Sequence, residues 1–164
     1  YGLPPTMGSD RLAAIVEARA LYPGRNILVI DSGSCITYEF ISPDGTYLGG
    51  NISPGVYMRL HAMHIGTALL PQVSLEGDTP QIGYDTDTAM RAGSVHGVNY
   101  EIEGYIRHLH AQHPDLVTII SGGADTKIDS GGAELVFDRD LVMKGLRRIL
   151  LETGSQNGAI TAKH

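Results

Sequence analysis

Apolar residues recur at helical spacing in four stretches of the chain. Leu12, Ile15, Val16 and Leu21 predict a helix over 11–22, which Pro23-Gly24 ends and Asp10 can cap. The same spacing predicts helices over 56–70, 86–113 and 140–151. In the longest of these, Gly93 and Gly97 lie four residues apart, a spacing that lets another backbone approach one helix face closely.

Five stretches predict strands. Residues 27–30 are aliphatic and lie between Asn26 and Asp31, which is typical of a strand buried on both faces. Residues 35–41 are rich in β-branched and aromatic types, and Asp44-Gly45 predicts a hairpin into 47–52. The first three strands should therefore form an antiparallel meander. Two further strands are expected at 116–120 and 133–137, with an irregular segment and a short helix between them.

This order of elements predicts an α/β fold, with a mixed sheet covered by helices. At the level of the fold, it resembles the ribonuclease-H-like domain of the actin, hexokinase and sugar-kinase group. Residues 71–85 should form a polar loop, and we expect the tail over 154–164 to fray. The domain boundaries that follow are 1–25 for an amino-terminal segment with a linking helix, and 26–153 for the ribonuclease-H-like domain.

Composition and charge exclude several classes of protein. The 164 residues include 42% hydrophobic and 18% charged residues, as in an ordered globular protein. A net charge of -6, with no basic cluster longer than Arg147-Arg148, argues against a nucleic-acid partner. Cys35 is the single cysteine, no apolar run approaches 20 residues, and no signal peptide is recognisable, so we expect no disulfide and no membrane span. A reducing cytoplasm is the expected location.

Three polar turns that contain glycine follow or flank the predicted strands. They are Asp31-Ser32-Gly33-Ser34, Gly49-Gly50 with Pro54-Gly55, and Ser121-Gly122-Gly123. Glycine allows close approach of a ligand, free backbone N–H groups and serine hydroxyls bind phosphate oxygens, and a carboxylate binds a cation. Together the turns predict a nucleotide cleft, although none of them matches a Walker-type P-loop or a dinucleotide fingerprint.

Asp10 and Arg11 are open to two interpretations. A helix cap accounts for Asp10 without any function. An acid that accepts a proton, next to a guanidinium that binds a carboxylate, would instead suit a substrate with a hydroxyl and a carboxylate. His61 with His64, and His110 with His113, share helix faces at metal-ligand spacing, but such pairs more often lie on a solvated face.

Taken in order, these motifs resemble the type III pantothenate kinases over nearly the whole chain. Tyr1-x-x-Pro4-x-x-x-Gly8-x-Asp10-Arg11 is similar to the substrate motif of that family, and Asp31-Ser32-Gly33-Ser34-Cys35-Ile36-Thr37 is similar to its second phosphate motif. The resemblance continues through residues 47–55, 68–71, 85–93, 120–123 and 141–146. The ordered set is much more specific than any one motif.

The resemblance implies transfer of the γ-phosphoryl group of ATP to the terminal hydroxyl of pantothenate, the first step toward coenzyme A. Asp10 would be the general base, and Asp31 would bind the monovalent cation, K⁺ or NH₄⁺, while Mg²⁺ accompanies ATP. ATP would contact Gly33, Ser34, Gly122 and Gly123. Pantothenate would contact Tyr1, Gly8, Ser9, Arg11 and Thr86. The family is dimeric, with the Thr86 region reaching the neighbouring substrate site, so a homodimer is implied.

Some features depart from the family pattern. Ser34 replaces the usual Thr, and Asp85 replaces the usual Asn. The first phosphate motif of the family is absent, and the chain opens on Tyr1-Gly2-Leu3 without an initiator Met, so we expect it to be cut from a longer polypeptide. The alternatives are a regulatory relative without catalysis, a kinase acting on another acid or sugar, and an inactive dimerising fragment.

Overall fold

The computed structural model describes residues 3–123 and 127–161, with side chains described up to residue 154. Five strands form one mixed sheet in the order β3-β2-β1-β4-β5. β1 (Ile27–Ser32) pairs antiparallel with β2 (Cys35–Ile41), which pairs antiparallel with β3 (Tyr47–Pro54). β1 also pairs in parallel with β4 (Val117–Gly122), and β4 with β5 (Glu134–Phe137). The predicted meander and mixed sheet are confirmed, in the strand order of a ribonuclease-H-like fold.

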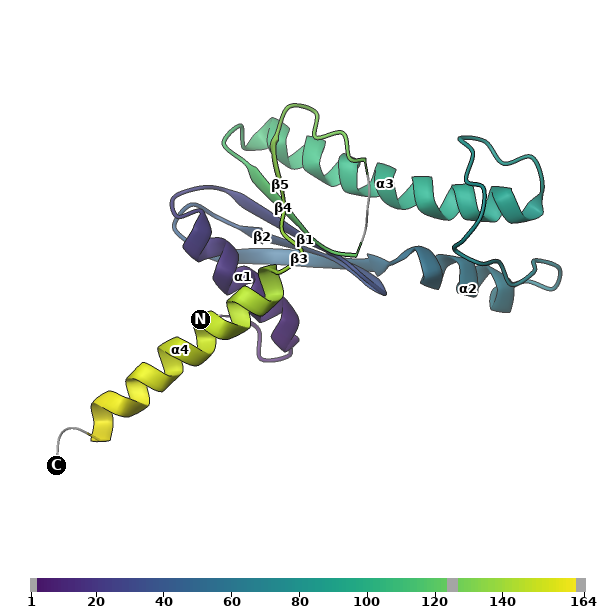
Figure 1. Cartoon of the computed structure of the whole chain (residues 1–164). Helices are drawn as coiled ribbons and strands as arrows, with labels where there is room; N and C mark the ends of the chain where they lie inside the picture. Colours follow the sequence, from purple (N-terminus) through teal and green to yellow (C-terminus); the bar gives the residue numbers. More distant parts are fainter. Residues whose placement is uncertain (1–2, 124–126, 162–164) are drawn as a thin grey trace.

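Helices cover both faces of this sheet. α1 (Ser9–Leu21) and α4 (Leu141–Thr161) lie on one face, and α3 (Thr86–Gln112) crosses the other (Figure 1). α2 (Val56–Gly66) lies beyond the end of the sheet, beside the first turns of α3. In the part of the chain that the structure describes, no helix is long and apolar enough to cross a membrane.

Successive side chains of β1 point to opposite faces of the sheet, and both sets are apolar, which explains why helices cover both faces. Ile27 and Val29 pack into the core beneath α1 and α4, whereas Leu28 and Ile30 pack into the core beneath α3. All four side chains are buried, as the run of aliphatic residues predicts. Burial of each such side chain contributes about 1.5–3 kcal/mol, so neither helical layer can be removed without loss of the sheet.

The hairpin between β2 and β3 forms at the predicted position. Gly45 has a φ of 82°, in the left-handed region that glycine adopts without steric cost. Its N–H donates to Ser42 O over 2.9 Å, and the N–H of Ser42 donates to Thr46 O over 2.9 Å. The turn therefore fixes the register of β2 and β3, on which one part of the candidate site depends.

Several boundaries differ from the sequence-based expectation. α1 begins at Ser9 with Gly8 as its N-cap, so the prediction that Asp10 caps the helix is wrong, and Asp10 lies in the first turn. α2 ends at Gly66 rather than at residue 70. α4 continues to Thr161, past the point where we expected fraying, and residues 162–164 lie outside the described part.

Two further expectations are not met among the described residues. The segment 127–133 forms no helix: residues 127–130 are irregular, and Gly131 and Gly132 form a turn in which both adopt positive φ. Within this chain, no backbone approaches the α3 glycines: a Cβ on Gly93 would have no neighbour within 4 Å, and one on Gly97 would meet only the Arg59 guanidinium at 3.6 Å.

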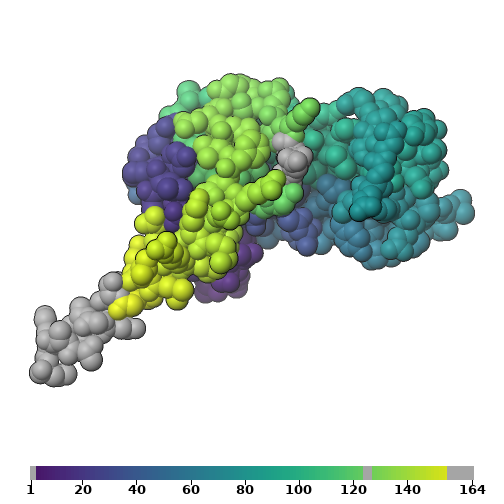
Figure 2. Space-filling model, in the orientation of Figure 1, coloured from purple at the N-terminus to yellow at the C-terminus, as the bar shows by residue number. Residues whose placement is uncertain are grey.

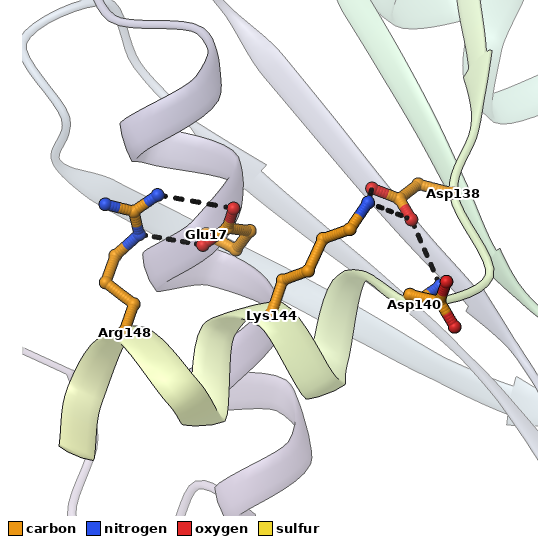
Figure 3. A network of polar contacts seen from close by, with 5 residues as sticks. All are labelled: Glu17, Asp138, Asp140, Lys144 and Arg148. Atoms are coloured by element: carbon orange, nitrogen blue, oxygen red, sulfur yellow. Dashed lines mark hydrogen bonds and ion pairs between the residues drawn. The ribbon is translucent and has the colours of Figure 1, made fainter. Parts of the chain in front are cut away.

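α1 and α4 instead make the close backbone contact. A Cβ on Gly145 would lie 1.9 Å from Ala13 O, so only glycine permits this spacing. Polar contacts flank the crossing (Figure 3): Arg148 Nε donates to Glu17 Oε2 over 2.7 Å, and Lys144 Nζ donates to Asp138 Oδ2 over 2.7 Å. Beyond the crossing, α4 projects from the body of the molecule (Figure 2), which leaves Leu150 and Leu151 exposed.

We predict opposite effects of two glycine substitutions in α4. Gly145→Ala places a methyl group against the α1 backbone and should lower the free energy of unfolding by about 1–3 kcal/mol. Gly154→Ala, on the same helix with nothing within 4 Å of the new Cβ, should raise it by about 0.5–1 kcal/mol through helix propensity. Urea denaturation of both variants measures this, and stabilisation by Gly145→Ala would contradict the packing of α1 on α4.

Candidate active site

The candidate site lies where β1 and β4 end side by side. In their parallel register, Asp31 pairs with Ser121 and Ser32 pairs with Gly122. The carboxyl ends of parallel strands are the usual location of ligand sites in open α/β sheets. The first turn of α1 and the β1–β2 turn meet the same edge, so segments far apart in the sequence come together here.

Asp31 and Asp10 form an acidic pair at this edge. Asp31 is half-buried at the end of β1, and burial raises its pKa, with a further contribution from the negative charge of Asp10. Neither carboxylate makes a hydrogen bond or ion pair with another described side chain. A half-buried carboxylate beside a second carboxylate, without a cationic partner, is a poor structural element and a suitable place for a cation.

Gly122 leaves room for this pair. Its φ is 90°, and a Cβ there would lie 2.3 Å from Ser32 O and 2.9 Å from Asp31 Oδ1. Gly123 N–H donates to Ser32 O over 3.1 Å, which ties the end of β4 to the end of β1. The chain turns sharply at Gly122 and exposes Gly123, so a ligand can approach the backbone there.

The β1–β2 turn completes the edge. Gly33 and Ser34 are exposed, and no described side chain hydrogen-bonds to the Ser34 hydroxyl. Gly55 N–H donates to Ser34 O over 3.0 Å, and a Cβ on Gly55 would lie 2.3 Å from Gly33 O. The structure therefore brings together three of the predicted polar segments, at residues 31–34, 54–55 and 121–123.

Gly8 and Ser9 begin α1 next to Asp10. A Cβ on Gly8 would lie 2.6 Å from Asp10 Oδ1, so the carboxylate occupies space that glycine leaves empty. Ser9 is exposed in the first turn of the helix. Helix N-termini favour negative charge, so the first turn of α1 is a favourable position for an acidic side chain.

Arg11 already has a carboxylate partner within the chain. Its Nε and Nη2 donate to the two carboxylate oxygens of Glu39 on β2, the Nη2 bond measuring 2.9 Å, and Nη2 also lies 3.3 Å from Tyr47 Oη. The hydrogen bond to Glu39 raises the pKa of Arg11, against a smaller opposite effect of burial. Burial and the hydrogen bond to Glu39 raise the pKa of Tyr47 to about 12.

Sequence reasoning missed Glu39 and Tyr47. The signal was present: Glu39 is a charged residue between Tyr38 and Phe40 in a strand of apolar and β-branched residues. Its side chain is 1% exposed, and a carboxylate buried to that degree requires a cationic or hydrogen-bonding partner. The sequence does not say which of the arginines supplies it.

Thr86 does not join the other predicted residues. It is exposed at the start of α3, whose first turns lie at the far end of the molecule from α1 (Figure 1). Asp85 forms a capping box there, because its Oδ1 accepts from Thr88 N over 2.8 Å while Thr88 Oγ1 accepts from Asp85 N over 3.1 Å. Tyr1 lies outside the described residues.

The loop that precedes Thr86 is hydrogen-bonded to α3. Arg91, which is buried, donates from Nε to Ser74 O over 2.9 Å and from Nη1 to Asp78 O over 2.7 Å. The polar loop predicted over 71–85 is confirmed in this form. The histidine pairs contribute no metal centre to the described part of the chain, where no group of three or more His, Cys, Asp or Glu side chains converges.

This chain is similar to known proteins of one family over most of its length. The profile of the type III pantothenate kinase family matches residues 1–108. A type III pantothenate kinase of Phocaeicola vulgatus is 50% identical over 151 residues, which are 92% of this chain and 62% of that protein. The type III pantothenate kinase of Bacteroides fragilis is 51% identical over the same shares. The chain thus spans less than two thirds of these curated relatives.

Among solved structures, a conserved protein of Campylobacter jejuni described as a Baf family transcriptional activator superimposes with a TM-score of 0.60. The two chains are 24% identical, and the match covers 93% of this chain and 68% of the other. At that identity the likeness concerns the fold, which agrees with the ribonuclease-H-like strand order. The sequence matches carry the stronger statement, and by them the chain belongs to the type III pantothenate kinase family.

Proposed function

We propose that this protein transfers the γ-phosphoryl group of ATP to the terminal hydroxyl of pantothenate and yields 4'-phosphopantothenate and ADP, the first step toward coenzyme A. Membership of the kinase family supports the reaction class. The observation that carries the proposal is the pairing of Asp10 with Asp31 at the edge formed by Gly122, Gly33 and Ser34.

In this proposal Asp10 is the general base. It accepts the proton of the pantothenate hydroxyl as that oxygen attacks the γ-phosphorus and the bond to the β,γ-bridging oxygen breaks. Phosphoryl transfer depends mainly on alignment and charge neutralisation, so one base and a set of positioning groups suffice. Gly8 supports the assignment, because its missing side chain leaves the Asp10 carboxylate room beside the site.

The phosphates of ATP would lie along the β1–β2 turn. Gly33 and the Ser34 hydroxyl are exposed there, and the N–H groups and hydroxyls of such turns suit phosphate oxygens. Gly122 and Gly123 would border the adenosine, where the positive φ of Gly122 lets a ligand approach the backbone. Ser34 supplies the hydroxyl that Thr supplies in the family pattern.

Asp31 is the proposed ligand of a monovalent cation, K⁺ or NH₄⁺, and Mg²⁺ would accompany the ATP phosphates. The residues fit such a cation, because the Asp31 carboxylate is half-buried beside Asp10 and has no cationic partner among the described side chains. A bound cation would supply positive charge that offsets the phosphates and the two carboxylates. Mg²⁺ retains water and binds mainly through phosphates, so it needs few protein ligands here.

We also propose that the protein acts as a homodimer in which the Thr86 region completes the substrate site of the neighbouring subunit. Three observations support this. Thr86 is remote from Asp10 within one chain, and two large apolar side chains just before it in the sequence, Ile82 and Tyr84, are 81% and 72% exposed. Gly93 lies on the same helix with open space above it.

Asp10→Asn should lower turnover of pantothenate by about 10²–10⁴-fold, the usual contribution of a general base, while pantothenate still binds. Coupled ADP-release assays on the protein at its full length, with calorimetric titration of pantothenate, test this. Asp44→Asn is the control, because Asp44 is exposed in the β2–β3 hairpin at the other end of the strands. Unchanged turnover in Asp10→Asn would exclude Asp10 as the base, and binding without turnover in the unmodified protein would favour a regulatory relative.

Asp31→Asn should stabilise the protein while removing its response to potassium. Burial raises the pKa of Asp31 above that of the unfolded chain, so stability falls as pH rises from the unfolded pKa through the folded one. At neutral pH the ionised carboxylate opposes folding, and its removal should raise Tm by about 1–3 °C in buffer without K⁺ or NH₄⁺.

Thermal melts with and without KCl separate the two effects. Potassium should raise the Tm of the unmodified protein and leave the Tm of Asp31→Asn unchanged, with NaCl at the same ionic strength as the control. A potassium-dependent rise that persists in the variant would place the cation elsewhere.

Gly93→Gln should convert the dimer to a monomer. A Cβ at residue 93 would have no neighbour within 4 Å in the chain, so the fold should be unchanged or slightly more stable, while the new side chain would occupy the proposed interface. Light scattering after size exclusion measures the mass, with Ala111→Gln, exposed near the end of α3, as the control. A dimer that survives Gly93→Gln would place the interface on another surface.

A further inference from the structure

The Arg11–Glu39–Tyr47 cluster lies on the same face of the sheet as the acidic pair. Asp31, Val29 and Ile27 alternate along β1, and Val29 packs toward α1. Glu39 is the cross-strand partner of Val29 in the antiparallel register, so its side chain projects from that same face. The first turn of α1 therefore covers both sites, with Asp10 near Asp31 and Arg11 on Glu39.

The contacts of Arg11 leave a defined part of the guanidinium unused. Nε and one N–H of Nη2 are bound to Glu39, and Tyr47 Oη lies 3.3 Å from Nη2. Tyr47 in turn donates to Glu39 Oε2 over 2.7 Å. No described residue accepts from Nη1, and the Arg11 side chain is 20% exposed. The two N–H groups of Nη1 thus point out of the cluster with a fixed orientation, because the guanidinium is planar.

Gly50 provides the space for this arrangement. It is the cross-strand partner of Glu39 on β3, and a Cβ there would lie 2.5 Å from Glu39 Oε2 and 3.0 Å from Tyr47 Oη. Any side chain at this position would displace the carboxylate from under Arg11. Gly50, predicted from sequence to lie at a ligand-binding turn, instead makes room for the residue that contacts Arg11.

We infer that Glu39, assisted by Tyr47, is a positioning residue that orients the free Nη1 edge of Arg11 toward the carboxylate of pantothenate; this rests on the proposed function. A lone arginine side chain samples many rotamers, and fixing one of them removes that entropy cost from substrate binding. The pairing with Glu39 also cancels most of the Arg11 charge. Recognition then depends on the direction of the two N–H groups more than on bulk attraction.

A comparable network elsewhere in the chain provides a matched control. Glu101 on α3 accepts from Tyr38 Oη over 2.6 Å and pairs with Arg59 and Ser53. It thus combines the same three elements, a carboxylate, an arginine and a tyrosine, on the opposite face of the sheet. Glu101→Gln weakens such a network without touching Arg11.

The test compares Glu39→Gln with Glu101→Gln on pantothenate and on a pantothenamide, an analogue whose carboxylate is replaced by an amide. Glu39→Gln should raise the KM for pantothenate by about ten- to a hundredfold, since misplacement of a positioning group produces losses of this size. The KM for ATP and the kcat/KM for the pantothenamide should change little. Tyr47→Phe, which retains the ring, should also lower the ratio of kcat/KM for pantothenate to kcat/KM for the pantothenamide, by a smaller factor than Glu39→Gln. Glu101→Gln should leave the ratio unchanged, even where its Tm falls.

Each other outcome has a defined meaning. If kcat/KM fell equally for pantothenate and for the pantothenamide in both Glu39→Gln and Tyr47→Phe, the role of Glu39 would be purely structural. A lower KM for pantothenate would show that Glu39 competes with the substrate for Arg11. Both results overturn the inference and leave the proposed function intact. Absence of pantothenate turnover in the unmodified protein would instead overturn the proposed function, and with it the inference.

Discussion

The position of α1 across one face of the sheet is the constraint on which the site depends. Both residues proposed to act on the substrate, Asp10 and Arg11, lie in the first turn of this helix. The helix is fixed from two sides: apolar residues such as Ile15 pack on β1, and the backbone at Ala13 lies against Gly145 of α4. A shift of α1 would therefore move Asp10 and Arg11 together, whereas Asp31 and Gly122 belong to the sheet and would remain in place.

The part of the site that belongs to the sheet is energetically unfavourable in the absence of a ligand. The sheet edge holds the half-buried carboxylate of Asp31, which has no cationic partner among the described side chains, and burial raises its pKa, with a further contribution from Asp10. Active sites often retain such unfavourable groups, because a ligand or ion supplies the missing interaction. Burial in the two apolar cores beneath α1 and α3 offsets this cost.

Most of the fold followed from local patterns in the sequence. The aliphatic run at 27–30, the Asp44-Gly45 turn and the periodicity over 86–113 each predict one element, and each element formed. The motifs that resemble the kinase family also located the acidic pair and the turns at 31–34 and 121–123. The start of α1 was misjudged, because an acidic residue in the first turn and an N-cap residue have the same composition signal and differ only in backbone geometry.

Glu39 could not be predicted from the sequence as the partner of Arg11, for a different reason. Glu39 is 28 residues from Arg11, and their contact depends on strand register, on the path of α1 and on the absence of a side chain at Gly50. None of these is a local property. Thr86 shows the opposite case, in which a residue grouped with the site by family resemblance lies at the other end of the chain's own structure.

The length of α3 has a mechanical consequence. Its 27 residues correspond to about 40 Å, with one end packed under the sheet through Ile102 and Ile106 and the other end free of it. Arg91 hydrogen-bonds the loop over 74–78 to the same helix, so a displacement of this end of α3 would carry that loop with Thr86. A tilt of about 5° about the packed turns at Ile102 and Ile106, about 24–30 Å from Thr86, would displace the tip by about 2–3 Å, roughly the length of one hydrogen bond. Substitutions in the core beneath α3 can therefore change the position of the surface around Thr86 without contacting it.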